Sequence, residues 1–343
     1  MSRTCGTTFE GIGPLRRVPV VLSLSDFTTL HLGGPAGRLV EARTDDELIA
    51  AAADDALLIA GGSNLVIADE GFPGTVVRIL TRGIARERNV LHVAAGEPWD
   101  GLVAHAVAEG LAGIECLSGI PGSVGATPIQ NVGAYGQEVS DVITSVRAYD
   151  RRGGRVLDLA PEECGFGYRD SMFKRSPGSF VVLRVSFALE PSDRARPIRY
   201  AELAAAVGEA PGLADVRAAV LDLRRGKGMV LDPQDPDTFS AGSFFTNPIL
   251  DAAALPDGAP AFPQPDGRVK TSAAWLIQHA GFAKGHGDPA GIAISSKHVL
   301  ALTNRGHGTT AQLLALAREI QDGVASAYGI RLEPEPVIVP ARP

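Results

Sequence analysis

The sequence predicts an α+β fold, because strands and helices mix along the chain without strict alternation. Near the start, the capping box Thr44-Asp45-Asp46-Glu47 begins an alanine-rich helix, and a short buried strand follows at residues 56–60. Further on, two consecutive strands form a hairpin around the turn Arg151-Arg152-Gly153-Gly154. We therefore expect an α+β protein rather than a doubly wound parallel sheet.

The first predicted unit runs from about Phe27 to Leu80 and forms a small α/β layer. Its helix continues through residues 48–53. The expected strands lie at residues 56–60, 65–68 and 75–80. The tetrapeptide Gly61-Gly62-Ser63-Asn64 directly follows the first of these strands.

The second predicted unit runs from about Thr81 to Met229 and contains a long glycine-rich loop at residues 117–136. Helices are expected at residues 99–109, where Gly110 ends the helix, and 215–225. Strands are expected at residues 90–95, 142–150, 155–159 and 179–189.

The last predicted unit begins near Leu231-Asp232-Pro233, which is typical of a linker. The expected elements are strands at residues 242–245, 299–303 and 330–339 and helices at residues 273–280 and 310–328. The sequence shows no internal repeat and no low-complexity tail.

The composition bounds the class of protein. With 343 residues, at roughly 100–200 residues per domain, two or three packed units are expected. Hydrophobic residues make up 45% and charged residues 21%, which suits a globular chain with sizeable cores. The net charge of −7 provides no basic field for a nucleic-acid backbone or an anionic membrane. We expect neither partner.

Cysteine spacing and hydropathy indicate the compartment. Cys5, Cys116 and Cys164 lie too far apart for a disulfide framework or a paired zinc motif. No apolar run reaches the ~18 residues of a membrane span. The first 17 residues lack a signal-peptide core, so we expect a loose leader and a cytoplasmic protein. The seven histidines show no metal-ligand spacing, and no metal is expected.

Two nucleotide-like motifs are judged to be structural. Residues 306–311, Gly-His-Gly-Thr-Thr-Ala, fit a Rossmann fingerprint, but only about thirty residues follow, too few for a second mononucleotide-binding half. We expect Thr309 or Thr310 to cap the following helix instead. Residues 285–290 fit the same pattern, but they follow a helix and contain a proline.

The two earlier glycine loops are candidates for a ligand site. Gly61-Gly62-Ser63-Asn64 ends a buried strand, where successive backbone N–H groups can surround an anion. The loop 120–136 carries glycines that let the backbone approach a flat ring or a pyrophosphate. Either loop alone is more often a structural turn, but two loops on adjacent lobes favour a ligand.

Five sequence blocks carry a resemblance to a known family. They are Gly61–Asn64, Ile120-Pro121-Gly122-Ser123-Val124-Gly125-Ala126 with Pro128–Gly136, Tyr168-Arg169-Asp170-Ser171, Ala241-Gly242-Ser243-Phe244-Phe245-Thr246-Asn247-Pro248 and Leu332-Glu333-Pro334-Glu335. In this order they resemble the UDP-N-acetylenolpyruvoylglucosamine reductases, flavoenzymes of peptidoglycan precursor synthesis. The resemblance extends from about Asp26 to Val339.

The resemblance implies a two-lobed FAD-binding fold of the vanillyl-alcohol-oxidase/PCMH type with a smaller α+β substrate domain. It divides the chain into a first FAD-binding lobe at 1–80, a second at 81–230 and a substrate-binding domain at 231–329. The final strand, about 330–343, is expected to return to the first lobe. NADPH would reduce non-covalently bound FAD, and UDP-N-acetylglucosamine enolpyruvate would then take hydride at C3 and a proton at C2. We expect a monomer.

The resemblance also implies roles for individual residues. Arg169, Ser243 and Glu335 would be catalytic, whereas Tyr200, Lys227 and Asn247 would bind substrate, Tyr200 as the closing tyrosine of the longer type I members. The residues expected to bind cofactor are Gly61, Gly62, Ser63, Asn64, Leu65, Pro121, Gly122, Ser123, Gly125, Ala126, Gln130, Asn131, Gly133 and Tyr135.

Elementary chemistry is compatible with these roles. Hydride addition leaves charge on the substrate carboxylate, which the fixed fork of Arg169 can meet with two hydrogen bonds. Without the resemblance, Arg169 would be assigned a surface salt bridge with Asp170. Ser243 would deliver the proton, for which a hydroxyl needs a neighbouring charge network. The ammonium of Lys227 suits a diphosphate, and Asn247 would bind the uridine diphosphate part.

One position departs from the family pattern, and two other readings stay open. Many relatives have Glu-x-Arg on the last strand, whereas this chain has Glu335-Pro336-Val337, so an arginine contact to cofactor phosphate is missing or supplied elsewhere. One alternative is a flavin oxidoreductase acting on a hydroxy acid or sugar, and another is a non-catalytic protein that binds a sugar nucleotide. A flavin spectrum and stopped-flow reduction of the enolpyruvyl substrate would separate them.

Overall fold

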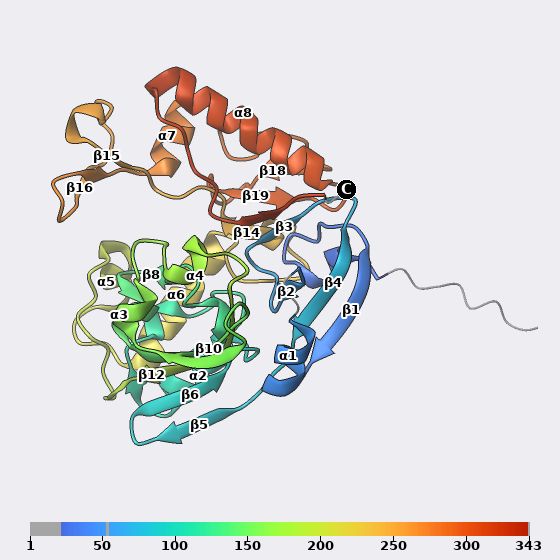
Figure 1. Ribbon diagram of the computed structural model, residues 1–343. Helices are drawn as coiled ribbons and strands as arrows, with labels where there is room; N and C mark the ends of the chain where they lie inside the picture. Colours follow the sequence, from blue (N-terminus) through green and yellow to red (C-terminus); the bar gives the residue numbers. More distant parts are fainter. Residues whose placement is uncertain (1–21, 53–54, 342–343) are drawn as a thin grey trace, which may run out of the picture.

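A computed structural model describes residues 22–52 and 55–341 of the chain (Figure 1). Its first sheet is parallel, in the order β1-β4-β2, and helix α1 follows β1 along the chain. The elements are β1 (Ala36–Ala42), α1 (Asp45–Ala51), β2 (Leu57–Ile59) and β4 (Phe72–Ile79). Thr44 begins α1, because its side chain accepts from the N–H of Glu47, whose own side chain accepts from the N–H of Thr44.

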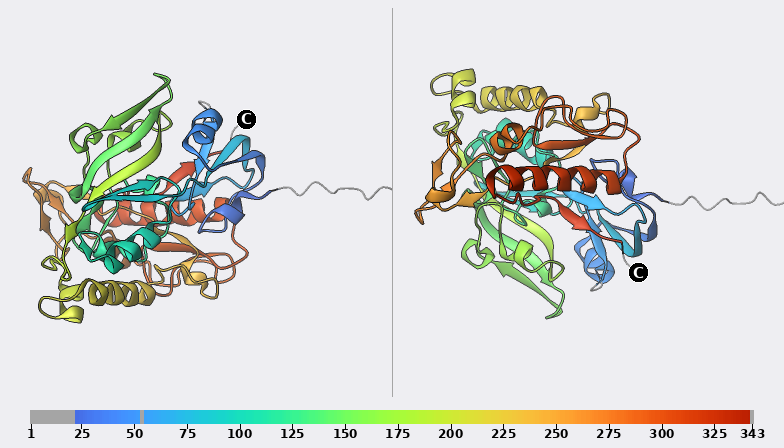
Figure 2. Two further views of the ribbon diagram at one scale, coloured as in Figure 1. Left: turned by 90° about the horizontal axis from the view of Figure 1, so that it is seen from below. Right: turned by 90° about the horizontal axis from the view of Figure 1, so that it is seen from above.

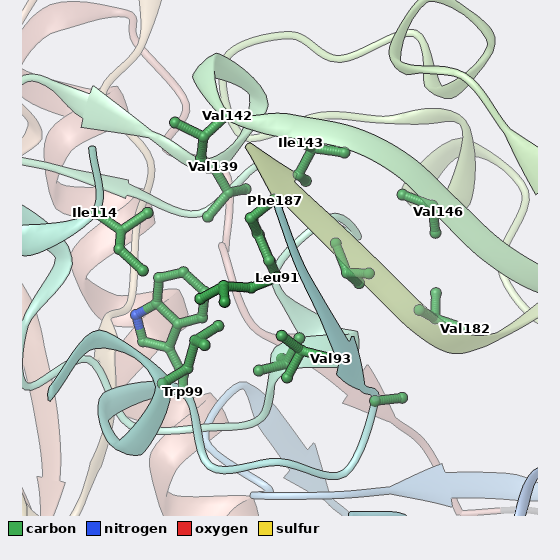
Figure 3. Close-up of a cluster of buried hydrophobic side chains, with 14 of the residues drawn as sticks. Leu91, Val93, Trp99, Ile114, Val139, Val142, Ile143, Val146, Val182 and Phe187 are labelled. Atoms are coloured by element: carbon green, nitrogen blue, oxygen red, sulfur yellow. The ribbon is translucent and has the colours of Figure 1, made fainter. Parts of the chain in front are cut away.

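The second sheet has five antiparallel strands in the order β11-β10-β12-β6-β5. They are β5 (Ile84–Glu87), β6 (Val90–Ala94), β10 (Ile143–Asp150), β11 (Arg155–Leu159) and β12 (Phe180–Ala188). Helix α2 (Trp99–Ala108) packs against this sheet through Trp99, whose ring lies 5.9 Å from that of Phe187 in the core (Figure 3). The indole Nε1 donates to the carbonyl of Leu117 at 3.0 Å, so its polar atom is satisfied.

Short elements fill the loop between α2 and β10. They are β7 (Leu111–Ala112), η2 (Glu115–Leu117), η3 (Val124–Ala126), β8 (Gly133–Ala134), β9 (Gln137–Glu138) and η4 (Val139–Asp141). Strands β8 and β9 form an antiparallel hairpin. After β11 come α3 (Pro161–Cys164) and α4 (Met172–Arg175). After β12 come β13 (Glu190–Pro191), α5 (Ala201–Val207) and α6 (Leu213–Gly226).

In the last part of the chain, helix α8 packs against a three-stranded antiparallel sheet with the order β14-β19-β18 (Figures 1 and 2). The elements are β14 (Ser240–Ser243), β18 (Ile292–Ile294), β19 (Ala301–Asn304), α7 (Ala273–His279) and α8 (Thr310–Tyr328). A small separate sheet, β15 (Ile249–Leu250), β17 (Val269–Lys270) and β16 (Phe262–Pro263), projects away from α8 in Figure 1.

The C-terminal segment runs back towards the start of the chain. Strand β20 (Val337–Val339) pairs in parallel with β3 (Leu65–Ile67), directly after the first glycine loop. Two side-chain contacts reinforce this junction, because Thr29 Oγ1 donates to Ser240 O at 2.6 Å and Thr310 Oγ1 donates to Ile67 O at 2.6 Å. Residues far apart in sequence therefore meet beside the first loop.

The α+β class is confirmed, and so are most of the elements expected from the sequence, within a few residues. Strands β1, β5 and β18 and helix α5 were not expected, and the expected last strand at 330–339 is shortened to β20. Thr309 caps α8 by accepting from the Gln312 N–H, which confirms the structural interpretation of residues 306–311. The expected leader lies outside the described residues. No helix of the described segments is long and apolar enough to span a membrane.

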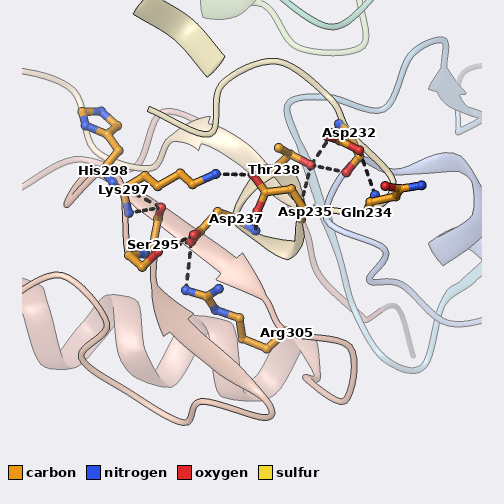
Figure 4. Close-up of polar contacts among 10 residues, drawn as sticks. Asp232, Gln234, Asp235, Asp237, Thr238, Ser295, Lys297, His298 and Arg305 are labelled. Carbon is orange, nitrogen blue, oxygen red and sulfur yellow. Dashed lines mark hydrogen bonds and ion pairs between the residues drawn. The ribbon is translucent and has the colours of Figure 1, made fainter. Parts of the chain in front are cut away.

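The expected linker at Leu231–Pro233 leads into an ordered turn, η5 (Pro236–Thr238). Asp237 is buried there, and it accepts from Ser296 Oγ at 2.5 Å and from Arg305 at 2.9 Å (Figure 4). Lys297 pairs with Asp235 at 2.5 Å on the same turn. The connection to the last sheet is thus fixed by charge-assisted hydrogen bonds.

Candidate active site

The two glycine loops identified in the sequence touch each other. A Cβ atom on Gly61 would lie 2.6 Å from Gly122 Cα, so no side chain fits between the loops. Gly62 has φ of +58°, and a Cβ there would lie 1.8 Å from Phe27 O. Ser63 Oγ donates to Pro121 O at 2.9 Å, and this bond joins the two loops directly. Glycine is required at these positions by close approach as well as by backbone conformation.

Unused hydrogen-bond donors gather where the loops meet. The backbone N–H groups of Gly62, Ser63 and Asn64 donate to no other described residue. Ser123 is 5% exposed, and its Oγ has no hydrogen-bond partner among the described residues. Buried polar groups are normally paired. Neither loop contains a carboxylate, so this donor set fits an anionic or polar ligand.

Residues with left-handed backbone lie in the second loop and beside it. Asn131, Tyr135 and Arg169 have φ values of +47°, +50° and +52°, which L-residues rarely adopt. Tyr135 and Gly136, with φ of +86°, form the two-residue turn of the β8–β9 hairpin, and a type I′ turn has positive φ at both positions. Such strain persists only where surrounding contacts enforce it, and it is concentrated at functional sites.

Arg169 is the centre of a polar cluster drawn from three parts of the chain. Its Nε lies 3.2 Å from Glu335 Oε1, and its Nη2 donates to Gly133 O at 2.7 Å. Lys174 Nζ donates to the carbonyl of Arg169 at 2.8 Å. Asp170 pairs instead with Arg175. The surface salt bridge considered for Arg169 and Asp170 is therefore absent from this arrangement.

Glu335 connects this cluster with Ser243. Its backbone N–H donates to Phe244 O at 2.8 Å, so the segment that carries Glu335 runs beside the residue after Ser243. Burial raises the pKa of Glu335, while the positive charges of Arg169 and Lys174 oppose the shift. Ser243 is half-buried at the end of β14, where it pairs with Ala301 of β19. The three candidate catalytic residues thus belong to one neighbourhood.

Two of the candidate substrate-binding residues lie near the β8–β9 turn. The Tyr200 ring stands edge-on to that of Tyr135, with centroids 5.3 Å apart. Lys227 Nζ lies 5.9 Å from the Tyr135 ring centroid and pairs with Glu202 at 2.7 Å. Burial alone would lower the pKa of Lys227, but its hydrogen bond to Glu202 and the nearby negative groups raise it. Lys227 is therefore a cation in this arrangement.

Asn247, the third candidate, lies beside Tyr168 and the start of α7. Its Oδ1 accepts from the Ala273 N–H at 2.9 Å at the start of α7. Burial raises the pKa of the neighbouring Tyr168, although hydrogen bonds from Asn247 oppose this shift. Lys270 Nζ lies 4.4 Å from the Tyr168 ring centroid. Tyr168, next to Arg169, thus contacts two residues of the last part of the chain.

Several of the expected cofactor residues already use their hydrogen-bonding groups within the protein. Asn64 Nδ2 donates to Gln130 Oε1 at 3.2 Å, which links the two loops. The Asn131 side chain is buried, and its Nδ2 already donates to Glu138 and to Gly167 O. The N–H of Gly125 donates to Ala95 O at 2.8 Å, so this amide is not free for a phosphate.

The remaining expected cofactor residues lie within or beside the same loops. Leu65 begins β3 directly after the first loop, and Ala126 ends η3 in the second. A Cβ on Gly125 would lie 2.5 Å from Ala95 Cβ, which indicates packing against the residue that directly follows β6. A Cβ on Gly133 would lie 2.8 Å from Glu138 Cγ and 3.3 Å from Arg169 Nη1, so glycine here makes room for Arg169.

Sequence reasoning missed several residues that support this site. Lys174 and Tyr168 contact Arg169 or its neighbours. Tyr168 belongs to one of the five sequence blocks but was assigned no role there, and Lys174, in the short helix α4, carries no distinctive signal. Glu115 does carry one, since it is an acidic residue within the apolar run Ile114-Glu115-Cys116-Leu117. It is fully buried.

Comparisons with known proteins identify one family along most of the chain. A model described as FAD binding domain matches residues 37–160, and one described as UDP-N-acetylenolpyruvoylglucosamine reductase, C-terminal domain, matches residues 233–339. The UDP-N-acetylenolpyruvoylglucosamine reductase of Streptomyces coelicolor is 55% identical, with coverage of 97% of this chain and 92% of that protein. That of Streptomyces avermitilis is 56% identical, with coverage of 92% and 93%.

Among solved structures, the crystal structure of UDP-N-acetylenolpyruvylglucosamine reductase from Thermus caldophilus matches with a TM-score of 0.68 at 29% identity. The match covers 93% of this chain and 98% of that chain. The fold, the facing glycine loops and the FAD binding domain define an FAD-dependent oxidoreductase. Within that class, the chain belongs to the UDP-N-acetylenolpyruvoylglucosamine reductase family.

The residues at the loop junction fit FAD. The unpaired N–H groups of Gly62–Asn64 suit a pyrophosphate, since successive backbone N–H groups bind anions well. The orphaned Ser123 hydroxyl supplies a further donor. The close contact of Gly61 with Gly122 keeps both backbones free of side chains at this point.

Proposed function

We propose that Arg169, Glu335 and Ser243 carry the second half of an NADPH-dependent reduction, in which UDP-N-acetylglucosamine enolpyruvate becomes UDP-N-acetylmuramate. The observation that carries this proposal is the contact of Arg169 with Glu335 beside the strand that bears Ser243. These residues come from three separate segments, and packing alone does not require two partly buried charges to meet there.

We further propose that Gly61–Leu65 and Pro121–Ala126, with Gln130, Asn131, Gly133 and Tyr135, hold the FAD. FAD, when bound, accepts hydride from NADPH and supplies it to the substrate. The protein residues bind and orient the reactants. The backbone N–H groups of the first loop and the Ser123 hydroxyl would hold the pyrophosphate.

Arg169 would bind the substrate carboxylate. Hydride addition at C3 places negative charge on C2 and on the carboxylate, and a guanidinium fork stabilises that charge with two hydrogen bonds. Its Nη2 is held by Gly133 O and its Nε by Glu335, which fixes the plane of the fork. A preorganised donor of this kind stabilises the transition state more than one that must reorient.

Ser243 would deliver the proton to C2. A hydroxyl is a weak acid, so it requires proximity and a favourable charge network, and Arg169 with Lys174 places two cations around the neighbouring Glu335. Phe244 and Phe245 are both 1% exposed, and their rings exclude water beside Ser243. Glu335 would orient Arg169 and stabilise the charged intermediate.

The sugar-nucleotide end would lie between Tyr200, Lys227 and Asn247. Lys227 is a half-buried cation whose present partner is the carboxylate of Glu202, an anion that a diphosphate can replace. Tyr200 is 47% exposed and faces Tyr135, so it can close over a ligand by a local movement. Asn247 would contact the uridine diphosphate part.

The wider setting of the enzyme follows from the same proposal. We assign residues 1–80 and 81–230 to the two FAD-binding lobes and 231–329 to the substrate-binding domain, with the last strand returning to the first lobe. A peptidoglycan precursor enzyme that uses NADPH would act in the cytoplasm, and we propose a monomer there. We propose neither a nucleic-acid nor a membrane partner.

Arg169→Lys tests the proposed function. Lysine keeps the charge but loses the fork, so flavin content and reduction of the flavin by NADPH should match the parent. Reoxidation by the enolpyruvyl substrate should slow by about 10²-fold, the usual loss for one preorganised donor. Stopped-flow absorbance measures both half-reactions. Arg155→Lys, at a side chain 70% exposed, is the matched control. Unchanged reoxidation in Arg169→Lys would contradict the role of Arg169.

A further inference from the structure

A buried polar network lies beneath the β8–β9 hairpin and involves none of the residues assigned so far to chemistry or binding. Glu115 is 0% exposed, in the short helix η2. Its Oε2 accepts from the Gly113 N–H at 2.6 Å, and its Oε1 accepts from Gln137 Nε2 at 2.9 Å. Both donors are neutral. A polar side chain is buried without a large cost only where its hydrogen bonds are made, and each carboxyl oxygen of Glu115 has a donor.

Gln137 connects Glu115 to the β8–β9 hairpin. Its Oε1 accepts from the Cys116 N–H at 2.9 Å, so both ends of its amide are engaged by η2. Its backbone lies in β9 opposite Ala134 of β8. The amide therefore clamps the hairpin to η2 in one orientation, since a flipped amide would present N–H to N–H at Cys116.

The β8–β9 hairpin, which Gln137 holds against η2, contains a left-handed residue in its turn. Its turn holds Tyr135 at φ of +50°, and such a conformation needs contacts that over-determine it. The next residue pair in the hairpin contains Gly133, whose carbonyl accepts from Arg169 Nη2 at 2.7 Å. The chain of contacts thus runs from Glu115 through Gln137 and β8 to the guanidinium that pairs with Glu335.

We propose that Glu115 and Gln137 are positioning residues for Arg169, which hold the β8–β9 hairpin so that the guanidinium meets the substrate carboxylate. This inference rests on the role proposed for Arg169. Neither residue touches the reacting atoms. Their effect is geometric, and a displacement of about 1 Å at a reacting group can cost about 10²-fold in rate.

The hydrogen-bond pattern allows a test by exchange of the two side chains. In Glu115→Gln, one carboxylate oxygen becomes an amide N–H₂ that opposes the N–H₂ of Gln137 or the Gly113 N–H. In Gln137→Glu, two carboxylate oxygens face each other. The double variant restores the pairing, because Gln at 115 accepts from Gly113 and donates to Glu at 137, which accepts from Cys116.

The experiment measures both half-reactions, flavin content and thermal stability for these variants. We expect Glu115→Gln and Gln137→Glu to slow reoxidation by UDP-N-acetylglucosamine enolpyruvate about tenfold to a hundredfold. Reduction by NADPH and flavin per chain should stay within about twofold of the parent, and the double variant should recover reoxidation to within about threefold. Glu162→Gln, an exposed carboxylate on α3, controls for loss of charge.

Three outcomes would overturn the inference. The first is a lower melting temperature in both single variants with unchanged reoxidation, which would leave a purely structural role. The second is an equal loss in both half-reactions, and the third is a double variant no better than the single ones. Arg169→Lys in the same series separates the two proposals. If it slows reoxidation while Glu115→Gln does not, the positioning role fails alone, and if Arg169→Lys has no effect, the proposed function fails as well.

Discussion

At the scale of single residues, Arg169 combines strain with close electrostatic support. A left-handed backbone costs an L-residue about 1–2 kcal/mol, and the Lys174 contact to its carbonyl helps to hold that conformation. Glu335 and Gly133 fix the side chain from the other end. A side chain held at both ends loses little entropy when it binds a carboxylate, which is the property that preorganised catalysis requires.

Lys227 provides a prediction about binding rather than chemistry. Lys227→Ala should raise KM for the sugar nucleotide about tenfold or more, because a charge-assisted hydrogen bond contributes about 1.5–3 kcal/mol, while kcat changes little. Flavin content should equal that of the parent. Steady-state kinetics with the enolpyruvyl substrate check this, with Lys284→Ala, at an exposed lysine, measured for comparison. Equal KM values for Lys227→Ala and the parent would contradict the assignment.

At the scale of elements, the contact between the two glycine loops explains a sequence feature and makes a prediction. Gly61→Ala places a Cβ 2.6 Å from Gly122 Cα, so the loops must separate and the FAD site must open. The purified variant should contain much less flavin per chain than the parent, as measured by absorbance. Gly101→Ala is the control, because its Cβ would meet only Pro98 Cβ, at 3.8 Å, on helix α2. Full flavin content in Gly61→Ala would show that the loop contact does not limit FAD binding.

The turn η5 supports a prediction about stability and pH. Burial alone would raise the pKa of Asp237, but hydrogen bonds from Ser296 and Ser295 and the charge of Arg305 outweigh it and lower the pKa (Figure 4). A lowered folded pKa means that the carboxylate stabilises the fold above its unfolded pKa, near 3.8, and that this stabilisation is lost as pH falls below that value.

Asp237→Asn should therefore destabilise the fold by about 3 kcal/mol at neutral pH, because it leaves Arg305 without its partner. The difference from the parent should shrink below about pH 4. Urea unfolding at several pH values measures it. Asp266→Asn, at an exposed pair with Arg268, is the control and should show no comparable loss. A difference that stays constant down to pH 3 would contradict the assigned ionisation.

At the scale of the whole molecule, the return of the chain assembles the site. Strand β20 pairs with β3 beside the first glycine loop, and the segment before it carries Glu335 past Phe244 to Arg169. Three segments separated by more than fifty residues in sequence thus form one cluster. Conversely, the β15–β17 sheet projects away from α8 and contributes Lys270 beside Tyr168.

The sequence predicted the local elements well, because periodicity, capping boxes and turn residues are local signals. Strand β1 was not predicted, because its small and charged residues show no alternation. It is stabilised by its pairing with β4. For the site, motif residues could be named in advance, but the Arg169–Glu335 contact and the Glu115–Gln137 network depend on tertiary packing. The close packing of Gly125 against Ala95 is likewise visible only in the structure.

The most direct test of the central claim is stopped-flow kinetics of Ser243→Ala. The claim is that Ser243, with Arg169 and Glu335, serves only the transfer to the enolpyruvyl substrate. The variant should bind FAD fully and be reduced by NADPH at the parent rate, while reoxidation by UDP-N-acetylglucosamine enolpyruvate falls by about 10²–10⁴-fold, the usual contribution of a positioned acid. Slow reduction by NADPH together with normal reoxidation would contradict the account.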